Sequence, residues 1–183
     1  MFLALSVILL PGVSGRPNKV DCEQLHVANH LVAWGHKTTN VPRHVEAIII
    51  HSSYNVLTPD SFSIDGILNE YRGINVSPHY IIDRKGTIYR LVIDNDVAYH
   101  AGRSSLPDGT TNVNAVSIGI ELINTPATPP DSLQYASLVR LVKCLRERYP
   151  VKFILGHSDI APGRKSDPWK FNWNEFRKML NAD

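Results

Sequence analysis

Two short, almost wholly apolar runs constrain the fold of this chain more than any other feature. The first, Glu46–His51, is rich in isoleucine and ends in a histidine, and the second is Val116–Ile123. Runs of this length and composition are typical of buried strands. Each run also holds a polar side chain that is unusual in such a setting, His51 at the end of the first and Glu121 within the second. A central sheet that presents a histidine and a glutamate is therefore expected.

The rest of the chain predicts further strands and several helices. His79–Asp83 and Thr87–Val92 flank a turn with a glycine and predict a hairpin, and Lys152–Leu155 predicts a last short strand. Apolar residues at helical spacing predict helices. These helices are expected within Asp21–Lys37, which leads into a loop, and over Asp60–Tyr71, Thr128–Tyr149 and Asn172–Leu180. No internal repeat is present, so a single α/β domain is predicted.

Length, charge and cysteine content exclude several classes of protein. The chain has 183 residues, of which 43% are hydrophobic and 20% charged, as expected for one domain with a full core. A net charge of +2 with scattered basic residues argues against nucleic-acid binding. Cys22 and Cys144 define no disulfide framework. Either they form a bridge after export, or Cys144 is a small core residue of a helix.

The first ten residues are almost wholly apolar, and small residues follow them up to Gly15. Such a run is too short to span a bilayer as a helix, so no integral membrane span is expected, but it suits the core of a secretory signal. No basic residue precedes it, so a buried N-terminal strand or helix is the alternative. We expect a signal peptide over residues 1–15, a lead-in segment over 16–45 and the main domain over 46–183. The chain is then exported, to the periplasm or beyond, or stays in the cytoplasm if the leader does not function.

A polar loop near the C-terminus, Gly156–Trp169, collects further chemically active side chains. Its glycines and prolines argue against a regular helix or a central strand. His157 and Asp167 offer a nitrogen and a carboxylate oxygen, which are both zinc ligands, and the bend between them would let them meet on one ion. Lys165 would then be a cation beside that ion. A surface loop with solvated charges is the alternative.

His51 supplies the third ligand that this loop lacks. A catalytic zinc takes three protein ligands and leaves one position for water, and His51, His157 and Asp167 have the right ligand types. The ion would lower the pKa of the bound water from about 15.7 toward about 7. Glu121 would carry the proton of that water to a leaving amine, and Lys165 would stabilise the oxyanion of an attacked amide.

Each of these assignments has a plainer alternative. His51 would otherwise be a packed core histidine with a hydrogen-bond partner. Glu121 would otherwise lie at a sheet edge with its carboxylate turned to solvent, because a charged glutamate among isoleucine and leucine is costly to bury without a partner.

Several motifs follow one another along the chain. They are the strand that ends in His51, and the segments His79–Gly86, Tyr99–Gly102, Ser117–Glu121 and Gly156–Pro168. Together they resemble the type-2 family of zinc-dependent N-acetylmuramoyl-L-alanine amidases, whose fold is shared with phage lysozyme-type amidases and animal peptidoglycan-recognition proteins. The resemblance covers roughly residues 47–180 in matching order, and the last motif is the most specific.

The resemblance implies a fold and a set of roles. The fold would be a single α/β domain with a central mixed sheet of about five or six strands flanked by helices. By resemblance, His51, His157 and Asp167 bind one Zn²⁺ ion, Glu121 is the base and Lys165 is the oxyanion partner.

Further residues fall in family motifs that line the cleft, and the resemblance implies that they bind substrate; these are His79, His100 and Asn114. The phage lysozyme-type members have a cysteine in place of Asp167, a tyrosine in place of Pro78 and no acid at the position of Glu121. This chain is therefore more similar to the bacterial branch that uses aspartate and glutamate.

The implied function is hydrolysis of the amide between N-acetylmuramic acid and L-alanine in peptidoglycan or muropeptides, by a monomer. Two alternatives remain. A non-catalytic peptidoglycan-binding protein on the same fold generally lacks a zinc ligand, whereas all are present here. A zinc amidohydrolase of another substrate would share this reaction centre, because the residues specify the centre better than the pocket around it.

Overall fold

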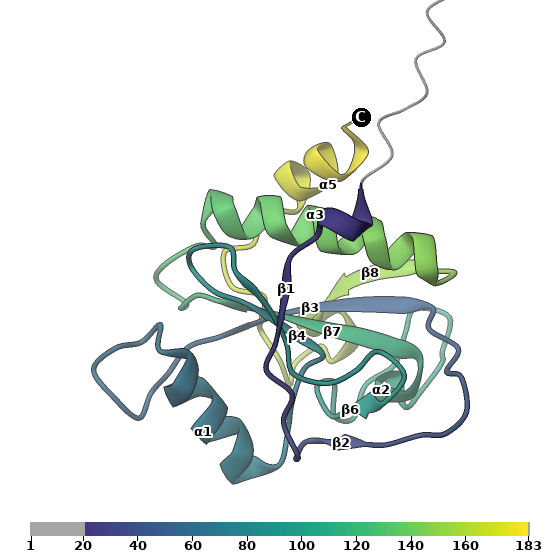
Figure 1. Ribbon diagram of the computed structural model, residues 1–183, viewed down its shortest axis with the longest axis horizontal. Coiled ribbons are helices and arrows are strands. Elements are labelled where there is room, and N and C mark those ends of the chain that lie inside the picture. The colour runs from purple at the N-terminus through teal and green to yellow at the C-terminus, as the bar shows by residue number, and fades with distance from the viewer. Residues whose placement is uncertain (1–20, 183) are drawn as a thin grey trace, which may run out of the picture.

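The structure is a computed structural model that describes residues 21–182 (Figure 1), so the predicted signal peptide, residues 1–15, lies outside the described residues. A six-stranded sheet with the order β1-β5-β4-β7-β3-β8 forms its centre. Its strands are β1 Val27–Asn29, β3 Ala47–Ser53, β4 Tyr80–Ile82, β5 Ile88–Arg90, β7 Ser117–Ile123 and β8 Phe153–Gly156. The hairpin of β4 and β5 is antiparallel and all other neighbours in this sheet are parallel. The predicted mixed sheet is confirmed.

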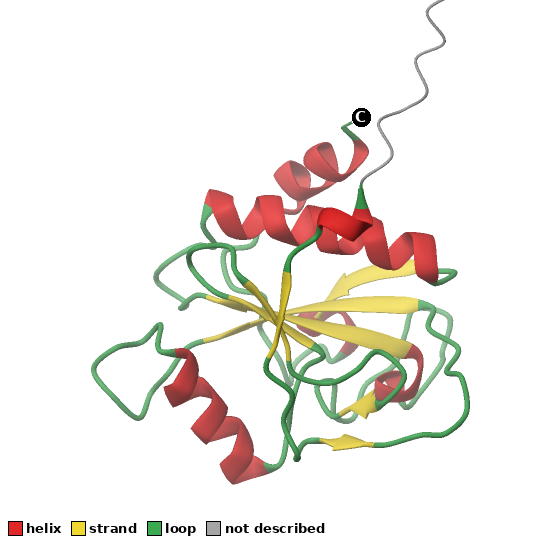
Figure 2. Cartoon of the chain, viewed as in Figure 1, coloured by secondary structure: helices red, strands yellow, loops and turns green. Residues whose placement is uncertain are grey.

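Helices cover both faces of this sheet (Figure 2). The helices are α1 Ile64–Ile74, α2 Val113–Val116, α3 Ser132–Arg148, α4 His157–Ile160 and α5 Trp173–Asn181, with a 3₁₀ turn η1 at Cys22–Gln24. One face carries α3 and α5, and the other carries α1, α2 and a small antiparallel pair, β2 His36–Lys37 and β6 Val97–Ala98. The single α/β domain expected from the sequence is confirmed.

Side chains of the central strands alternate between these two layers. Ile48 and Ile50 pack in the cluster that includes the apolar face of α3, whereas Ile49 packs on the other side. Since successive side chains of a strand point to opposite faces, His51 lies on the side away from α3. Glu121 pairs with His51 across β3 and β7, and it lies on the same side. The strand period therefore directs both polar side chains away from the main core.

Two predictions of local structure are wrong. The segment Asp21–Lys37 holds no α-helix but η1, β1 and β2, because its backbone pairs along the edge of the sheet, as where the His30 N–H donates to the Arg90 carbonyl at 2.9 Å. The loop Gly156–Trp169 does contain one helical turn, α4. Asp159 stabilises the start of that turn by accepting a hydrogen bond from the Gly156 N–H at 2.7 Å.

The first long helix starts four residues later than expected. The sequence predicts a start at Pro59 and Asp60, but the side chain of Ser63 caps α1 by accepting a hydrogen bond from the Gly66 N–H. A capping serine thus determines the start, and Pro59 lies in a bend that precedes it.

Cys22 and Cys144 form a disulfide with their Cα atoms 5.5 Å apart. The bridge links η1 to α3 across a sequence separation of 122 residues. Of the two alternatives, the structure shows the bridge. It ties the N-terminal edge of the described chain to the layer that lies away from His51 and Glu121.

Removing this bridge is expected to lower the stability of the protein without changing the positions of His51 and Glu121. The double substitution Cys22→Ser, Cys144→Ser should lower the free energy of unfolding by about 2–5 kcal/mol, because a cross-link between distant residues restricts the unfolded chain. Urea denaturation of the two proteins, each with and without a reductant, measures the difference. Equal stability of the variant and the oxidised wild type would contradict the expectation.

Candidate metal centre and active-site cleft

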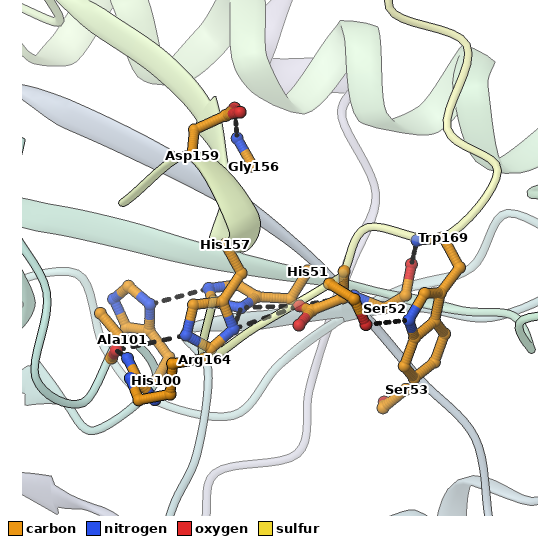
Figure 3. A network of polar contacts seen from close by, with 12 residues as sticks. His51, Ser52, Ser53, His100, Ala101, Gly156, His157, Asp159, Arg164 and Trp169 are labelled. Atoms are coloured by element: carbon orange, nitrogen blue, oxygen red, sulfur yellow. Dashed lines mark hydrogen bonds and ion pairs between the residues drawn. The ribbon is translucent and has the colours of Figure 1, made fainter. Parts of the chain in front are cut away.

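Parallel pairing of β3 and β8 brings two histidines together. Ile50 pairs with Gly156, so the next residues, His51 within β3 and His157 at the start of α4, lie side by side. Figure 3 shows a polar contact between their rings, which meet edge to face. Asp167 joins them from the loop beyond α4, where the Ser158 N–H donates to the Asp167 carbonyl at 2.8 Å. Strand register and this loop contact together place the predicted ligands next to one another.

The three ligand atoms form a nearly equilateral triangle. The Nδ1 atoms of His51 and His157 lie 3.0 Å apart, and Oδ2 of Asp167 lies 3.4 Å from the first and 3.2 Å from the second. A tetrahedral ion with bonds of about 2.0–2.1 Å, as for zinc, would separate its ligands by about 3.3 Å. All three side chains are buried. The donor set and its spacing fit a small divalent metal ion.

The outer nitrogens of the two rings also have partners. Nε2 of His157 donates to the Ala101 carbonyl at 3.2 Å, because a carbonyl only accepts. The Nδ1 lone pair of His157 is then directed to the triangle. Nε2 of His51 lies 3.0 Å from Nδ1 of His100. Such outer contacts hold the ligand rings in place.

Burial and hydrogen bonds together set the protonation of His51 and Asp167. Burial lowers the pKa of His51 to about 4, against a smaller opposing effect of Asp167. Burial alone would raise the pKa of Asp167, but hydrogen bonds with His157 and His51 hold it below the usual range. A neutral imidazole and an ionised carboxylate are the forms that bind a metal at neutral pH.

Glu121 lies beside the triangle on a central strand. Because β7 pairs with both β3 and β4, the sheet-edge alternative is excluded. The residue is only 7% exposed, yet it lines the same cleft as the three predicted metal ligands. Burial, and then the charge of Asp167, raises its pKa to about 8, although hydroxyl groups of Tyr71 and Ser53 oppose this shift. A carboxyl with a pKa near neutrality suits proton transfer in either direction.

The cleft combines these polar groups with apolar walls. Lys165 lines it together with the ligands and Glu121. Its other walls are formed by residues that include Tyr71, Ile74, Val76, Pro78, Tyr99, His100 and Trp169. Apolar and aromatic surface beside polar groups that converge on one point is typical of a small-molecule site.

Two of the residues predicted to bind substrate lie outside the cleft wall. His79 is completely buried, where Nε2 donates to the Asp96 carbonyl and Nδ1 accepts from the Gly119 N–H, both at 3.1 Å. Oδ1 of Asn114 accepts from the N–H groups of His100 and Ala101 at 3.1 and 2.8 Å. Both ring nitrogens of His79 and the side-chain oxygen of Asn114 bind backbone groups of the protein itself, and only His100 of the three lines the cleft.

Two further residues at the site are not identified by the sequence. The Tyr71 hydroxyl donates to the Ser53 hydroxyl at 2.7 Å, and both lie against Glu121. The helical pattern predicts Tyr71 only as an apolar position. Nothing in the sequence shows whether a tyrosine contributes its apolar ring to packing or its hydroxyl group to a hydrogen bond. The pair Ser52–Ser53, directly after His51, is the one signal that the sequence offers.

Because His79 is buried, the stability of the protein is expected to depend measurably on pH. Burial, followed by the charge of Arg43, lowers its folded pKa from 6.5 to about 3. Between these values the unfolded chain binds more protons, so stability rises with pH and is lost as pH falls below about 6.5. His79 contributes about 1.4 kcal/mol per pH unit to this slope. Urea denaturation of the metal-free protein from pH 7 to 5 should show a smaller slope for His79→Gln, and an unchanged slope would contradict the assignment.

Comparison with known proteins agrees with this geometry. A family model described as N-acetylmuramoyl-L-alanine amidase matches residues 41–170, more than half of the chain. The chain belongs to this family. The predicted resemblance is thereby confirmed.

Several members of the family are similar to this chain in sequence. The 1,6-anhydro-N-acetylmuramyl-L-alanine amidase AmpD of Enterobacter cloacae is 41% identical over 116 residues, which are 62% of this chain and 62% of that protein. The N-acetylmuramoyl-L-alanine amidase AmiD of Escherichia coli K12 is 31% identical over 197 residues, covering 97% of this chain and 67% of the relative. The match to the first relative therefore spans less than two thirds of its length.

Solved structures of the family share the fold. A selenomethionine derivative of AmpD superposes with a TM-score of 0.73 at 30% identity, covering 84% of this chain and 94% of that one. AmiD from E. coli, in complex with the substrate anhydro-N-acetylmuramic acid-L-Ala-D-gamma-Glu-L-Lys, gives a TM-score of 0.66 at 28% identity, covering 80% of this chain and 62% of AmiD.

The predicted export of the chain is contradicted by these relatives. Several of them are AmpD enzymes, and AmpD is a cytoplasmic amidase. Within residues 21–182 no helix has the length and apolar character needed to cross a membrane.

Proposed function

We propose that this chain is a zinc-dependent hydrolase that cleaves the amide between N-acetylmuramic acid and L-alanine in peptidoglycan-derived muropeptides. The observation that carries the proposal is the triangle of His51, His157 and Asp167 with Glu121 on the neighbouring strand, all at one cleft. The catalytic domain corresponds to residues 46–183. All of these residues come from one chain, so that a monomer suffices for the reaction.

The roles follow from where each group lies. His51, His157 and Asp167 would hold one Zn²⁺ ion, which supplies Lewis acidity and lowers the pKa of water when bound. Glu121 takes the proton of the attacking water and passes it to the leaving amine of L-alanine. The Lys165 ammonium, in the same cleft, stabilises the negative charge that develops on the carbonyl oxygen.

The substrate class comes from the relatives. AmpD is named for a 1,6-anhydro substrate and AmiD was solved with an anhydro-muropeptide. The apolar walls at Tyr99 and Trp169 suit a sugar ring or an alanine methyl group better than a highly charged ligand. We therefore propose that a released anhydro-muropeptide is accepted.

Product analysis tests this function. The purified protein, with one zinc ion per chain by elemental analysis, is incubated with intact peptidoglycan and separately with an anhydro-muropeptide. Mass spectrometry should detect free stem peptides that begin with L-alanine, together with intact sugars. Binding without products would support the non-catalytic alternative, and cleavage of a different amide would support another zinc amidohydrolase.

A further inference from the structure

A row of hydrogen bonds runs from a buried carbonyl to the first metal-binding histidine. The Ser117 hydroxyl donates to the Val113 carbonyl at 2.6 Å. Oγ of Ser117 lies 3.2 Å from Nε2 of His100, and Nδ1 of His100 lies 3.0 Å from Nε2 of His51. The row ends at the imidazole whose Nδ1 belongs to the ligand triangle.

Donor and acceptor roles can be assigned along this row from its fixed end. The Val113 carbonyl only accepts, so the single proton of the Ser117 hydroxyl is used there. Oγ must then accept the proton of His100 Nε2, which leaves Nδ1 of His100 as an acceptor. His51 consequently carries its proton on Nε2, and its Nδ1 lone pair is free for a metal ion.

The same stretch of backbone orients the second histidine. The Ala101 carbonyl accepts the Nε2 proton of His157, and it also accepts from Arg164 at 2.8 Å (Figure 3). Asn114 holds this stretch by binding both of its N–H groups. His100 and Ala101 therefore reach the two ligand rings from adjacent positions of one segment.

Gly119, which has no side chain, leaves room for the His100 ring. The His100 ring lies against β7 at Gly119, where a Cβ atom would come within 2.4 Å of the ring. Any other residue at position 119 would push the ring away from its present place between Ser117 and His51. The position of the His100 ring over β7 therefore requires glycine at position 119.

We propose that His100–Ala101, braced by Asn114 and directed by Ser117, is a positioning device that sets the tautomer of both metal-binding histidines. This inference rests on the proposed metal site and replaces substrate binding as the role of His100 and Asn114. The segment acts through the ligands and needs no contact with the substrate. Outer partners of this kind typically change metal affinity by about 10- to 100-fold.

The tautomers can be observed directly by NMR. Two-bond ¹⁵N–¹H correlation of protein labelled at histidine separates the Nε2–H and Nδ1–H forms of each ring. His51, His100 and His157 should all be in the Nε2–H form at neutral pH in the zinc-loaded protein. An Nδ1–H or doubly protonated His100 would overturn the proposal. Ser117→Ala should move His100 away from the Nε2–H form.

Metal affinity gives a second, independent readout. Chelator competition should show zinc binding weakened by about 10- to 100-fold in His100→Phe, with a smaller loss in Ser117→Ala. His100→Asn should recover part of the loss, because its side-chain oxygen can accept the His51 proton. Ser137→Ala is the matched control, since the Ser137 hydroxyl also donates to a carbonyl at 2.6 Å, that of Gly86 on the α3 side.

The outcomes separate this inference from the proposed function. Ser117→Ala with the affinity of Ser137→Ala would overturn the positioning role, whatever the activity on muropeptides. If His100→Phe does not fold, Ser117→Ala still decides the matter. A wild-type protein that binds no zinc would instead refute the proposed metal centre, and the histidine tautomers of that protein would still confirm or refute the hydrogen-bond directions.

Discussion

Replacing His157 with alanine is expected to remove the metal ion and reduce muropeptide hydrolysis to the background rate. The two remaining ligands, His51 and Asp167, cannot provide the three protein ligands that a catalytic zinc requires. The loss also leaves Asp167 without one of its two histidine partners. Elemental analysis after dialysis, together with product formation by mass spectrometry, measures both effects.

An exposed histidine supplies the control for this substitution. His26 lies outside the cleft, and His26→Ala should keep one zinc ion per chain and the wild-type rate. If His157→Ala retained stoichiometric zinc, the triangle of ligand atoms would not be the metal site. Circular dichroism of both variants separates loss of metal from loss of fold.

Replacing Glu121 with glutamine is expected to lower kcat by about 10²- to 10⁴-fold, the usual contribution of a general acid–base group. Glutamine has nearly the same size but cannot accept and return the proton of the attacking water. Zinc binding should be retained, because Glu121 contributes no atom to the ligand triangle. Steady-state kinetics with measured zinc content tests both parts.

A second buried carboxylate of the same sheet provides the control. Glu46 precedes β3 at its opposite end and pairs with Lys152 at 2.8 Å. Glu46→Gln should leave kcat unchanged, which would show that loss of a buried carboxyl group elsewhere is not enough to lower the rate. Full activity of Glu121→Gln would remove Glu121 as the base and leave the proton carrier to be found elsewhere in the cleft.

Some of the structural features behind these predictions can be recognised in the sequence, and others cannot. The runs Glu46–His51 and Val116–Ile123 identify central strands because short runs rich in isoleucine and valine are typical of buried strands. The types of the ligands also follow from sequence, since His51, His157 and Asp167 stand in motifs whose residue types match those of a zinc site. The longest helix, predicted over Thr128–Tyr149, is recognisable from its apolar stripe, and the structure places it at Ser132–Arg148 with Asp131 as its cap.

Other features depend on contacts between distant parts of the chain. The segment Asp21–Lys37 has helical spacing of its apolar residues, yet pairing with β5 outweighs that local preference. The bridge between Cys22 and Cys144 needs Cα atoms brought to 5.5 Å, which cysteine spacing cannot show. His79 and Asn114 occupy cleft motifs, but packing turns them toward backbone groups.

The amino-acid sequence by itself determined which strands are buried and which side chains are able to bind a metal ion, because burial and ligand chemistry are properties of individual residues and short runs. Only the tertiary structure decided that these side chains meet. Parallel register sets His51 beside Glu121 and next to His157, and register is a relation between strands far apart in the chain. The proposed positioning role of His100 and Asn114 likewise depends on hydrogen bonds that only the folded chain shows.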